Sequence, residues 1–305
     1  MSRFRLLSSM VVMAVMATLM LAPTAHATFP ARNGLIAFQA DTGSGYQIYT
    51  MRPNGHDLRQ ITHVDGEAIK PDWSPDGRRI AFALNECSIA IMNADGSNLT
   101  VLPSQTPGGC EADPSFTPNG SRLVFERYDP SIEDDAVWSM NLDGTDRQPI
   151  TSAGAPDPNV SPDGKTVSFL GGPEDATALF TAALDGSNLF QVTPAIGVAF
   201  KHDWAPDGRH LAITDNANDL SKPANIATIR PDGTGLRYLT HYRSPDLRAY
   251  VGSYSPDGQW IVFRLEDHGS YGLYRMRPDG SDLHPILPLS SFRPRNIDWG
   301  PAQES

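Results

Sequence analysis

Charged side chains recur just before a repeated turn of the chain, and their types could do chemistry if they face one another. One copy of the turn is Ser74-Pro75-Asp76-Gly77, and Asp72 precedes it by two residues. Carboxylates that converge on an axis could hold a hard cation such as Ca²⁺, which takes roughly six to eight oxygen ligands. They could instead satisfy backbone amides at the start of a strand. The candidates are Lys70, Asp72, Asp113, Asp157, Lys201, His202, Asp203 and Asp298.

His202 stands next to Asp203 in this set. A histidine beside a carboxylate could orient a general base or a metal ligand. Neighbouring residues of a strand point to opposite faces, however, so the alternative is a polar, partly hydrated side chain without a catalytic role. A metal-dependent hydrolase or lyase would need His202, Asp203 and the more distant His268 to reach one point.

A second group of side chains gathers arginine and tyrosine in the last third of the chain. These residue types are enriched in binding hot spots, and arginine grips carboxylates and phosphates with two hydrogen bonds. The alternative is that the arginines pair with nearby acids such as Asp246, Glu266 and Asp267 and hold loops in place. The group comprises Tyr242, Arg243, Arg248, Tyr250, Arg264, Tyr271, Phe292, Arg293 and Arg295.

The turns that position these residues explain the fold. In Ser-Pro-Asp-Gly the proline presets φ, the aspartate suits the third position, and the glycine supplies a positive φ, so two strands reverse there. The turn returns about every 43 to 50 residues, a period within the range of propeller blades. Its further copies are Thr117-Pro118-Asn119-Gly120, Ser161-Pro162-Asp163-Gly164, Ala205-Pro206-Asp207-Gly208 and Ser255-Pro256-Asp257-Gly258.

A second turn alternates with the first, for example at Ala94-Asp95-Gly96 and Leu142-Asp143-Gly144. Each period therefore holds four short strands, which predicts an all-β, six-bladed β-propeller of four-stranded blades. The series of repeats begins with a partial copy at Arg32-Asn33-Gly34 and ends with another partial copy at Asp298-Trp299-Gly300-Pro301. We expect the C-terminal strand to complete the first blade, which removes the open sheet edge.

These WSPDG-type repeats, with their Ile80-Ala81-Phe82 and Ile48-Tyr49-Thr50-Met51 segments, resemble the TolB-like β-propeller repeat family over about residues 32–301. The resemblance implies a propeller that binds partners. The α/β domain that precedes the propeller in the TolB protein is not found here. Propellers of this kind also precede hydrolase domains in prolyl-peptidase-like enzymes, but the Gly-x-Ser-x-Gly motif of their nucleophile is not present.

The first thirty residues predict export. Arg3 and Arg5 precede an apolar run from Leu6 to Leu21, and Ala25-His26-Ala27 fits a signal-peptidase site. We expect a signal peptide at 1–27 and one propeller domain at 28–305, periplasmic or secreted, monomeric and with no membrane span in the mature chain. An uncleaved anchor is the alternative. The formal net charge of −11 disfavours nucleic acid as a partner.

The two cysteines, Cys87 and Cys110, fall in connections that we place on the same face and in the same blade. In an exported protein such a pair is predicted to form a disulfide, and free thiols or a metal pair are the alternatives.

The sequence thus predicts a binding module, whose protein or peptide partner docks on the face of the longer loops through Tyr242, Arg243, Arg248, Tyr271, Arg293 and Arg295. No cofactor is expected apart from the Ca²⁺ considered above. The alternatives are the metal-dependent hydrolase or lyase at the channel mouth and a carbohydrate-binding propeller. The tryptophans Trp73, Trp138, Trp204 and Trp299 recur at equivalent positions, which indicates packing between blades more than sugar stacking.

Overall fold

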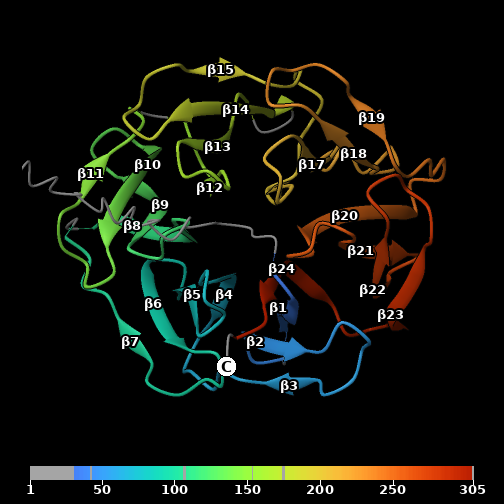
Figure 1. Ribbon diagram of the computed structural model, residues 1–305, viewed down its shortest axis with the longest axis horizontal. Helices are drawn as coiled ribbons and strands as arrows, with labels where there is room; N and C mark the ends of the chain where they lie inside the picture. The colour runs from blue at the N-terminus through green and yellow to red at the C-terminus, as the bar shows by residue number, and fades with distance from the viewer. Residues whose placement is uncertain (1–30, 42, 106–107, 153, 174–175, 304–305) are drawn as a thin grey trace, which may run out of the picture.

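The computed structural model describes residues 31–41, 43–105, 108–152, 154–173 and 176–303. These form a ring of six four-stranded antiparallel sheets, the blades, around a central channel (Figure 1). The predicted six-bladed propeller is confirmed. The signal peptide predicted at 1–27 lies outside the described residues. Within the described ranges, no helix is long and apolar enough to cross a membrane.

Each blade runs from an inner strand beside the channel to a short outer strand at the rim. The strands of blades one to three are β24 (Pro294–Pro301), β1 (Asn33–Asp41), β2 (Tyr46–Met51) and β3 (Arg59–Gln60); β4 (Ala68–Trp73), β5 (Arg79–Leu84), β6 (Ser88–Asn93) and β7 (Thr100–Val101); and β8 (Cys110–Phe116), β9 (Arg122–Asp129), β10 (Asp134–Asn141) and β11 (Gln148–Pro149). Those of blades four to six are β12 (Asn159–Val160), β13 (Thr166–Gly171), β14 (Ala178–Ala183) and β15 (Phe190–Gln191); β16 (Asp203–Trp204), β17 (Leu211–Thr214), β18 (Ile226–Ile229) and β19 (Arg237–Tyr238); and β20 (Leu247–Tyr254), β21 (Ile261–Asp267), β22 (Ser270–Met276) and β23 (His284–Ser290).

The repeated turns have the geometry that their residues favour. Gly77 adopts a φ of 66° and its N–H donates to the carbonyl of Ser74 at 2.9 Å. The hydroxyl of Ser74 donates to Asp76 at 2.7 Å and accepts the N–H of Arg79 at 2.8 Å. These turns, together with the Asp-Gly turns between third and outer strands, define one side of the ring, here called the turn face. The opposite side, formed by the connections between second and third strands and between blades, is called the loop face.

The C-terminal strand closes the ring as predicted. β24 pairs with β1 in antiparallel register, with Asn33 opposite Pro301 and Ile36 opposite Trp299. The N–H of Ala302 donates to the carbonyl of Arg32 at 2.8 Å, so the two ends rebuild one turn. Blade one therefore has four strands, like the other five blades.

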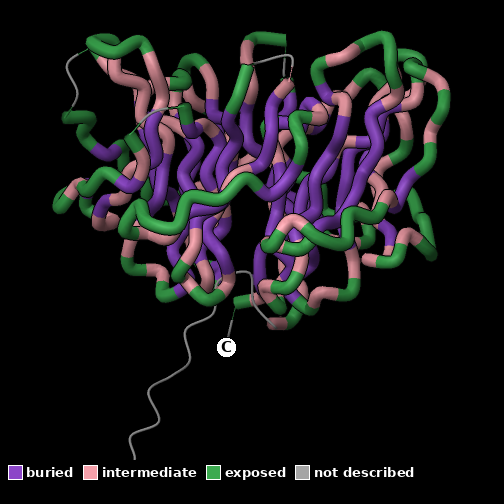
Figure 2. Tube along the Cα trace, turned by 90° about the horizontal axis from the view of Figure 1, so that it is seen from above, coloured by how far each residue is buried: buried purple, intermediate pink, exposed green. Residues whose placement is uncertain are grey.

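The hydrophobic core lies between neighbouring blades, and Figure 2 shows the buried strands standing side by side in the ring. The tryptophans of the inner strands pack into these layers. Trp73 of blade two packs with Ala37 and Ile48 of blade one, and Trp204 of blade five packs with Leu170 of blade four. The predicted role of these rings in packing between blades agrees with these contacts.

Cys87 and Cys110 form the predicted disulfide. Cys87 follows β5, in the connection to β6 of blade two, but Cys110 is the first residue of β8. The bond therefore joins blades two and three, and the expectation that both cysteines belong to one blade is wrong. The difference arises because the inner strand of blade three begins earlier than the turn pattern indicates. Closing a loop of 23 residues stabilises the fold by about 3 kcal/mol in the chain-entropy model.

Candidate functional site

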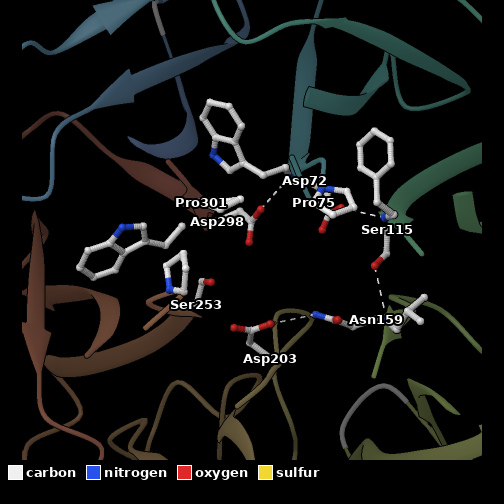
Figure 3. A pocket seen from close by; sticks show the side chains of 13 residues that line it. Asp72, Pro75, Ser115, Asn159, Asp203, Ser253, Asp298 and Pro301 are labelled. Carbon is white, nitrogen blue, oxygen red and sulfur yellow. Dashed lines mark hydrogen bonds between the residues drawn. The ribbon is translucent and has the colours of Figure 1, made fainter. Parts of the chain in front are cut away.

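The central channel is lined by one polar residue from each inner strand, placed just before the aromatic or apolar residue at the strand end (Figure 3). Asp298 of blade one accepts the N–H of Trp73 of blade two at 2.8 Å. Asp72 in turn accepts the N–H of Phe116 of blade three at 2.8 Å. These carboxylates therefore join each blade to the next, as the amide-satisfying alternative predicts. The six residues are Asp72, Ser115, Asn159, Asp203, Ser253 and Asp298.

A second charged layer lies two residues earlier in the inner strands and lines a neighbouring cavity of the channel. Lys70, Asp113 and Asp157 all adopt positive φ, between 49° and 61°, which is uncommon for residues other than glycine. Lys70 forms an ion pair with Asp113 in which Asp113 is almost fully buried. The backbone N–H of Lys70 donates a hydrogen bond to Oε1 of Gln39, in blade one, at 2.7 Å. The unusual backbone is thus fixed by contacts between blades and points charged groups at the axis.

Burial and mutual repulsion shift the protonation of the channel acids. Burial raises the pKa of Asp203 to about 6, with the Lys201 charge opposing the shift and Asp298 adding to it. Burial and then the Asp298 carboxylate raise the pKa of Asp72 well above its ordinary value. Burial alone would lower the pKa of Lys201, but the carboxylates of Asp298, Asp203 and Asp72 raise it. Lys201 therefore stays charged and serves as the counter-ion of this ring.

His202 is buried in surroundings that do not suit a general base. Burial, followed by the charge of Lys201, lowers its pKa to about 3, so the imidazole is neutral at physiological pH. Its Nε2 lies 2.8 Å from the hydroxyl of Ser168, which also accepts the indole N–H of Trp204 at 2.9 Å. Packing of this kind is typical of a structural histidine. His268, by contrast, is 72% exposed and contacts Asp267 and Asp246.

No three His, Cys, Asp or Glu side chains within the described ranges gather closely enough to hold a metal ion. Asp72 and Asp298 accept hydrogen bonds from backbone amides, and Asp113 forms an ion pair with Lys70.

The raised pKa of Asp203 predicts a pH-dependent stability. An aspartate in the unfolded chain titrates near 3.8, so the folded protein binds more protons between that value and about 6. The free energy of unfolding attributable to this group therefore rises as the pH falls, by about 1 kcal/mol between pH 7.5 and pH 5. Asp203→Asn keeps an acceptor for the N–H of Tyr254, which now lies 2.7 Å from Asp203, and removes the titration.

Urea unfolding at pH 7.5 and pH 5 measures this difference. The gap between wild type and Asp203→Asn should change with pH, whereas the gap for Asp95→Asn, at an exposed turn residue whose pKa is lowered by hydrogen bonds from Ser97, should stay constant between these two pH values. Equal pH dependence in wild type and Asp203→Asn would show that Asp203 does not titrate in this range.

Arg248 is buried against the loop that follows β17. It is 4% exposed, and its guanidinium donates to the carbonyls of Asn216 and Ala217 at 3.0 and 2.7 Å. It also donates to the carbonyls of Asp219 and Lys222. Arg248 therefore holds the loop between β17 and β18, and the partner-binding role predicted for it stays a prediction.

The structure brings Arg293, Arg295 and Tyr271 together at the loop-face mouth of the channel. The guanidinium of Arg293 lies over the ring of Tyr271 at 4.7 Å, and that of Arg295 lies over Tyr46 at 5.7 Å. The guanidinium of Arg264 approaches the same Tyr271 ring at 5.9 Å. Among the residues that the structure describes, the expected pairing of the cluster with acids is seen for Arg264, which lies 3.8 Å from Glu266.

Tyr242 and Arg243 lie in the connection from blade five to blade six. Arg243 is exposed. The half-buried Tyr242 packs against the core between blades five and six, and its N–H donates to Asn225 at 2.8 Å. Of these two residues, Arg243 is the more exposed.

Two further residues at this mouth are functional candidates. The sequence predicts a place in the channel for Lys201 and does not single out Phe200. Both line a cavity of about 150 Å³ together with Tyr250, Arg264 and Arg295. The position of Lys201 in the repeat predicts that it lines the channel, and nothing at that position indicates that it also lines the cavity at the mouth. Phe200 is 47% exposed, and the signal that the sequence offered for it was an aromatic residue outside the strand pattern.

The comparisons with known proteins agree with this architecture. The family described as TolB beta propeller domain matches residues 18–155. The Protein TolB homolog of Chlorobium luteolum (strain DSM 273 / BCRC 81028 / 2530) is 28% identical over 208 residues, which make up 66% of this chain and 45% of that protein. The Uncharacterized peptidase YuxL of Bacillus subtilis (strain 168) is 29% identical over 188 residues, 50% of this chain and 29% of that protein. The chain spans less than half the length of these two relatives.

Among solved structures, TolB from Acinetobacter baumannii superimposes with a TM-score of 0.73 at 19% identity, covering 88% of this chain and 67% of that one. At this identity the likeness shows the fold. The fold defines the class of this protein as a β-propeller module. Its repeats are similar to those of the TolB-like β-propeller family, and the predicted resemblance is confirmed.

Proposed function

We propose that this protein is an exported binding module, whose protein or peptide partner docks on the loop face beside the channel mouth. The observation that carries the proposal is the charge of Arg293 and Arg295. Neither has a carboxylate within ion-pair distance among the described residues, and the Nε of each is buried without a hydrogen-bond partner. Arginine and tyrosine with unused bonding capacity at the centre of a face are the groups that dominate binding energy.

Two further findings support the proposal. The Cys87–Cys110 disulfide fits an oxidising compartment outside the cytosol. Curated relatives with TolB-like repeats include the Tol-Pal system protein TolB of Nitratidesulfovibrio vulgaris, which its name places in an assembly with other proteins. The channel acids, in contrast, are already engaged in joining blades.

The proposal predicts that a partner captured by the wild-type protein is lost when the loop-face charge is reversed. Residues 28–305 serve as bait for extracts of the cell envelope and the culture supernatant of the producing organism. The test variant carries Arg243→Glu and Arg293→Glu, because both side chains lie on the loop face. Arg248 is left unchanged, because its loss would disrupt the loop that it holds. A tenfold or greater loss of the captured protein is expected, equivalent to the loss of at least one charge-assisted contact between the two arginines and the partner.

The matched control carries Arg59→Glu and Arg209→Glu, an equal change of charge at the rim and on the turn face, where both residues are exposed. It should capture the same protein as the wild type. Bands that survive in the loop-face variant, or that disappear in both variants, would contradict docking at this face.

A further inference from the structure

The cavity at the channel mouth gathers positive side chains whose charge the described residues balance only in part: the channel carboxylates face Lys201, but no acid within ion-pair distance is described for Arg293 or Arg295. Its walls carry Lys201, Arg264 and Arg295, and Arg293 shares the ring of Tyr271 with Arg264. The acid within ion-pair distance of these arginines, in the described ranges, is Glu266, at 3.8 Å from Arg264. Like charges so close repel one another, and a counter-charge from outside would relieve that repulsion.

Arg264 is the most informative member of the cavity. It is 7% exposed, and its Nε is buried without a hydrogen-bond partner. The centre of the Tyr250 ring lies 4.2 Å from the guanidinium of Arg264, and this contact fixes the orientation of the guanidinium plane. Burial, opposed by Tyr250 and Glu266 and assisted by Arg295 and Arg293, lowers the pKa of Arg264 to about 10, so it remains charged. A buried arginine held rigid by aromatic rings, with unused donors, is arranged to receive an oxyanion.

The size and surroundings of the cavity select the kind of oxyanion. A volume of about 150 Å³ holds a carboxylate with a few attached carbons or about five waters. Phe200, 47% exposed, stands at the rim and offers an apolar surface to the chain that carries the carboxylate. An acidic side chain or a chain end of a polypeptide has this combination of one negative group and an apolar neighbour.

We propose that this cavity binds a carboxylate of an acidic segment of the partner protein, with Arg264 and Arg295 gripping its oxygens and Phe200 packing against the adjoining residue. The inference rests on the proposed function and specifies its ligand chemistry. The carboxylate could come from a Glu side chain or from a C-terminus. Both sources share the chemistry and can be separated by peptide probes.

Three acetylated tripeptides test the proposal by calorimetric titration into residues 28–305. Acetyl-Tyr-Glu-Glu-amide carries side-chain carboxylates alone, acetyl-Tyr-Gln-Gln with a free C-terminus carries a terminal carboxylate alone, and acetyl-Tyr-Gln-Gln-amide carries neither. We expect one or both of the acidic probes to bind and the neutral probe not to bind. Binding should weaken at least tenfold in Arg295→Gln and should weaken with rising salt.

The matched control is Arg209→Gln on the turn face, which should bind the acidic probe as the wild type does. Arg264→Gln is tested beside Arg295→Gln, with thermal melting to show that each variant is folded. Binding that is equal for acidic and neutral probes, or unchanged in both cavity variants, would overturn the proposal. Binding of inorganic phosphate without either acidic peptide would also overturn it. If the extract experiment captures a partner through the loop face while the acidic probes fail, the binding module stands and the carboxylate pocket does not.

Discussion

A chain cut before Asn296 is expected to melt at least 10 °C below the full protein. The cut removes most of β24, including Ile297 and Trp299, which are buried between blades one and six. Truncating one buried side chain of this size costs about 3 to 5 kcal/mol, so losing both exceeds about 6 kcal/mol. A kilocalorie shifts the melting temperature of a domain this large by about 2 to 4 °C.

The cut also removes contacts that join the ring. Asp298 no longer accepts the N–H of Trp73, and β1 loses the partner that pairs Ile36 with Trp299. The damage should be local at first, because each blade has its own sheet. Hydrogen exchange is therefore expected to accelerate in β1 and β2 while amides of β13 and β14, across the ring, keep their protection.

Trp299→Ala gives a milder version of the same lesion, because it leaves the strand in place and removes one ring. It should cost about 3 to 5 kcal/mol in urea unfolding. A truncated chain that melts like the full protein, with β1 still protected, would mean that the C-terminal strand does not hold the ring closed.

The fold was predictable from the sequence because its determinants are local. Ser74, Asp76 and Gly77 build their turn from contacts within six residues of one another, so the turn can be read wherever its residues recur. The closure was predictable for the same reason: half of a known turn stands at each end of the repeats. The start of β8 at Cys110 was not, because no turn residue marks it.

The site was predictable only as a set of candidates. Asp72 bonds an amide 44 residues away, and nothing in the local sequence says whether a carboxylate at that position meets an amide or a cation. The arginines show the same limit. Arg248 and Arg293 belong to the same group of arginines and tyrosines in the last third of the sequence. Yet Arg248 donates to four loop carbonyls, and the guanidinium of Arg293 lies over a tyrosine ring. Side-chain direction across blades decides their roles, and it depends on the assembled ring.

Arg147 and Glu111 show how strongly such an unforeseen contact can matter. Arg147→Ala is expected to lower the free energy of unfolding by about 3 to 5 kcal/mol, because it leaves a buried carboxylate without its charge partner. The two side chains are 6% and 1% exposed, and Nη1 of Arg147 lies 2.6 Å from Oε1 of Glu111. Arg147 also donates to the carbonyl of Pro103 at 2.6 Å, so it links blade three to the end of blade two.

The double variant Arg147→Met with Glu111→Gln separates the cost of the orphaned charge from the worth of the pair. Because a buried ion pair can be replaced by less polar groups of similar size at little cost, the double variant should recover most of the stability lost in Arg147→Ala. Arg52→Ala is the control: its pair with Asp57 is exposed at 63% and 48%, so its loss should cost less than about 1 kcal/mol. Urea unfolding at pH 7.5 measures all three. A loss in Arg147→Ala as small as in Arg52→Ala would show that Glu111 finds another partner or water, and that the junction of blades two and three does not depend on this pair.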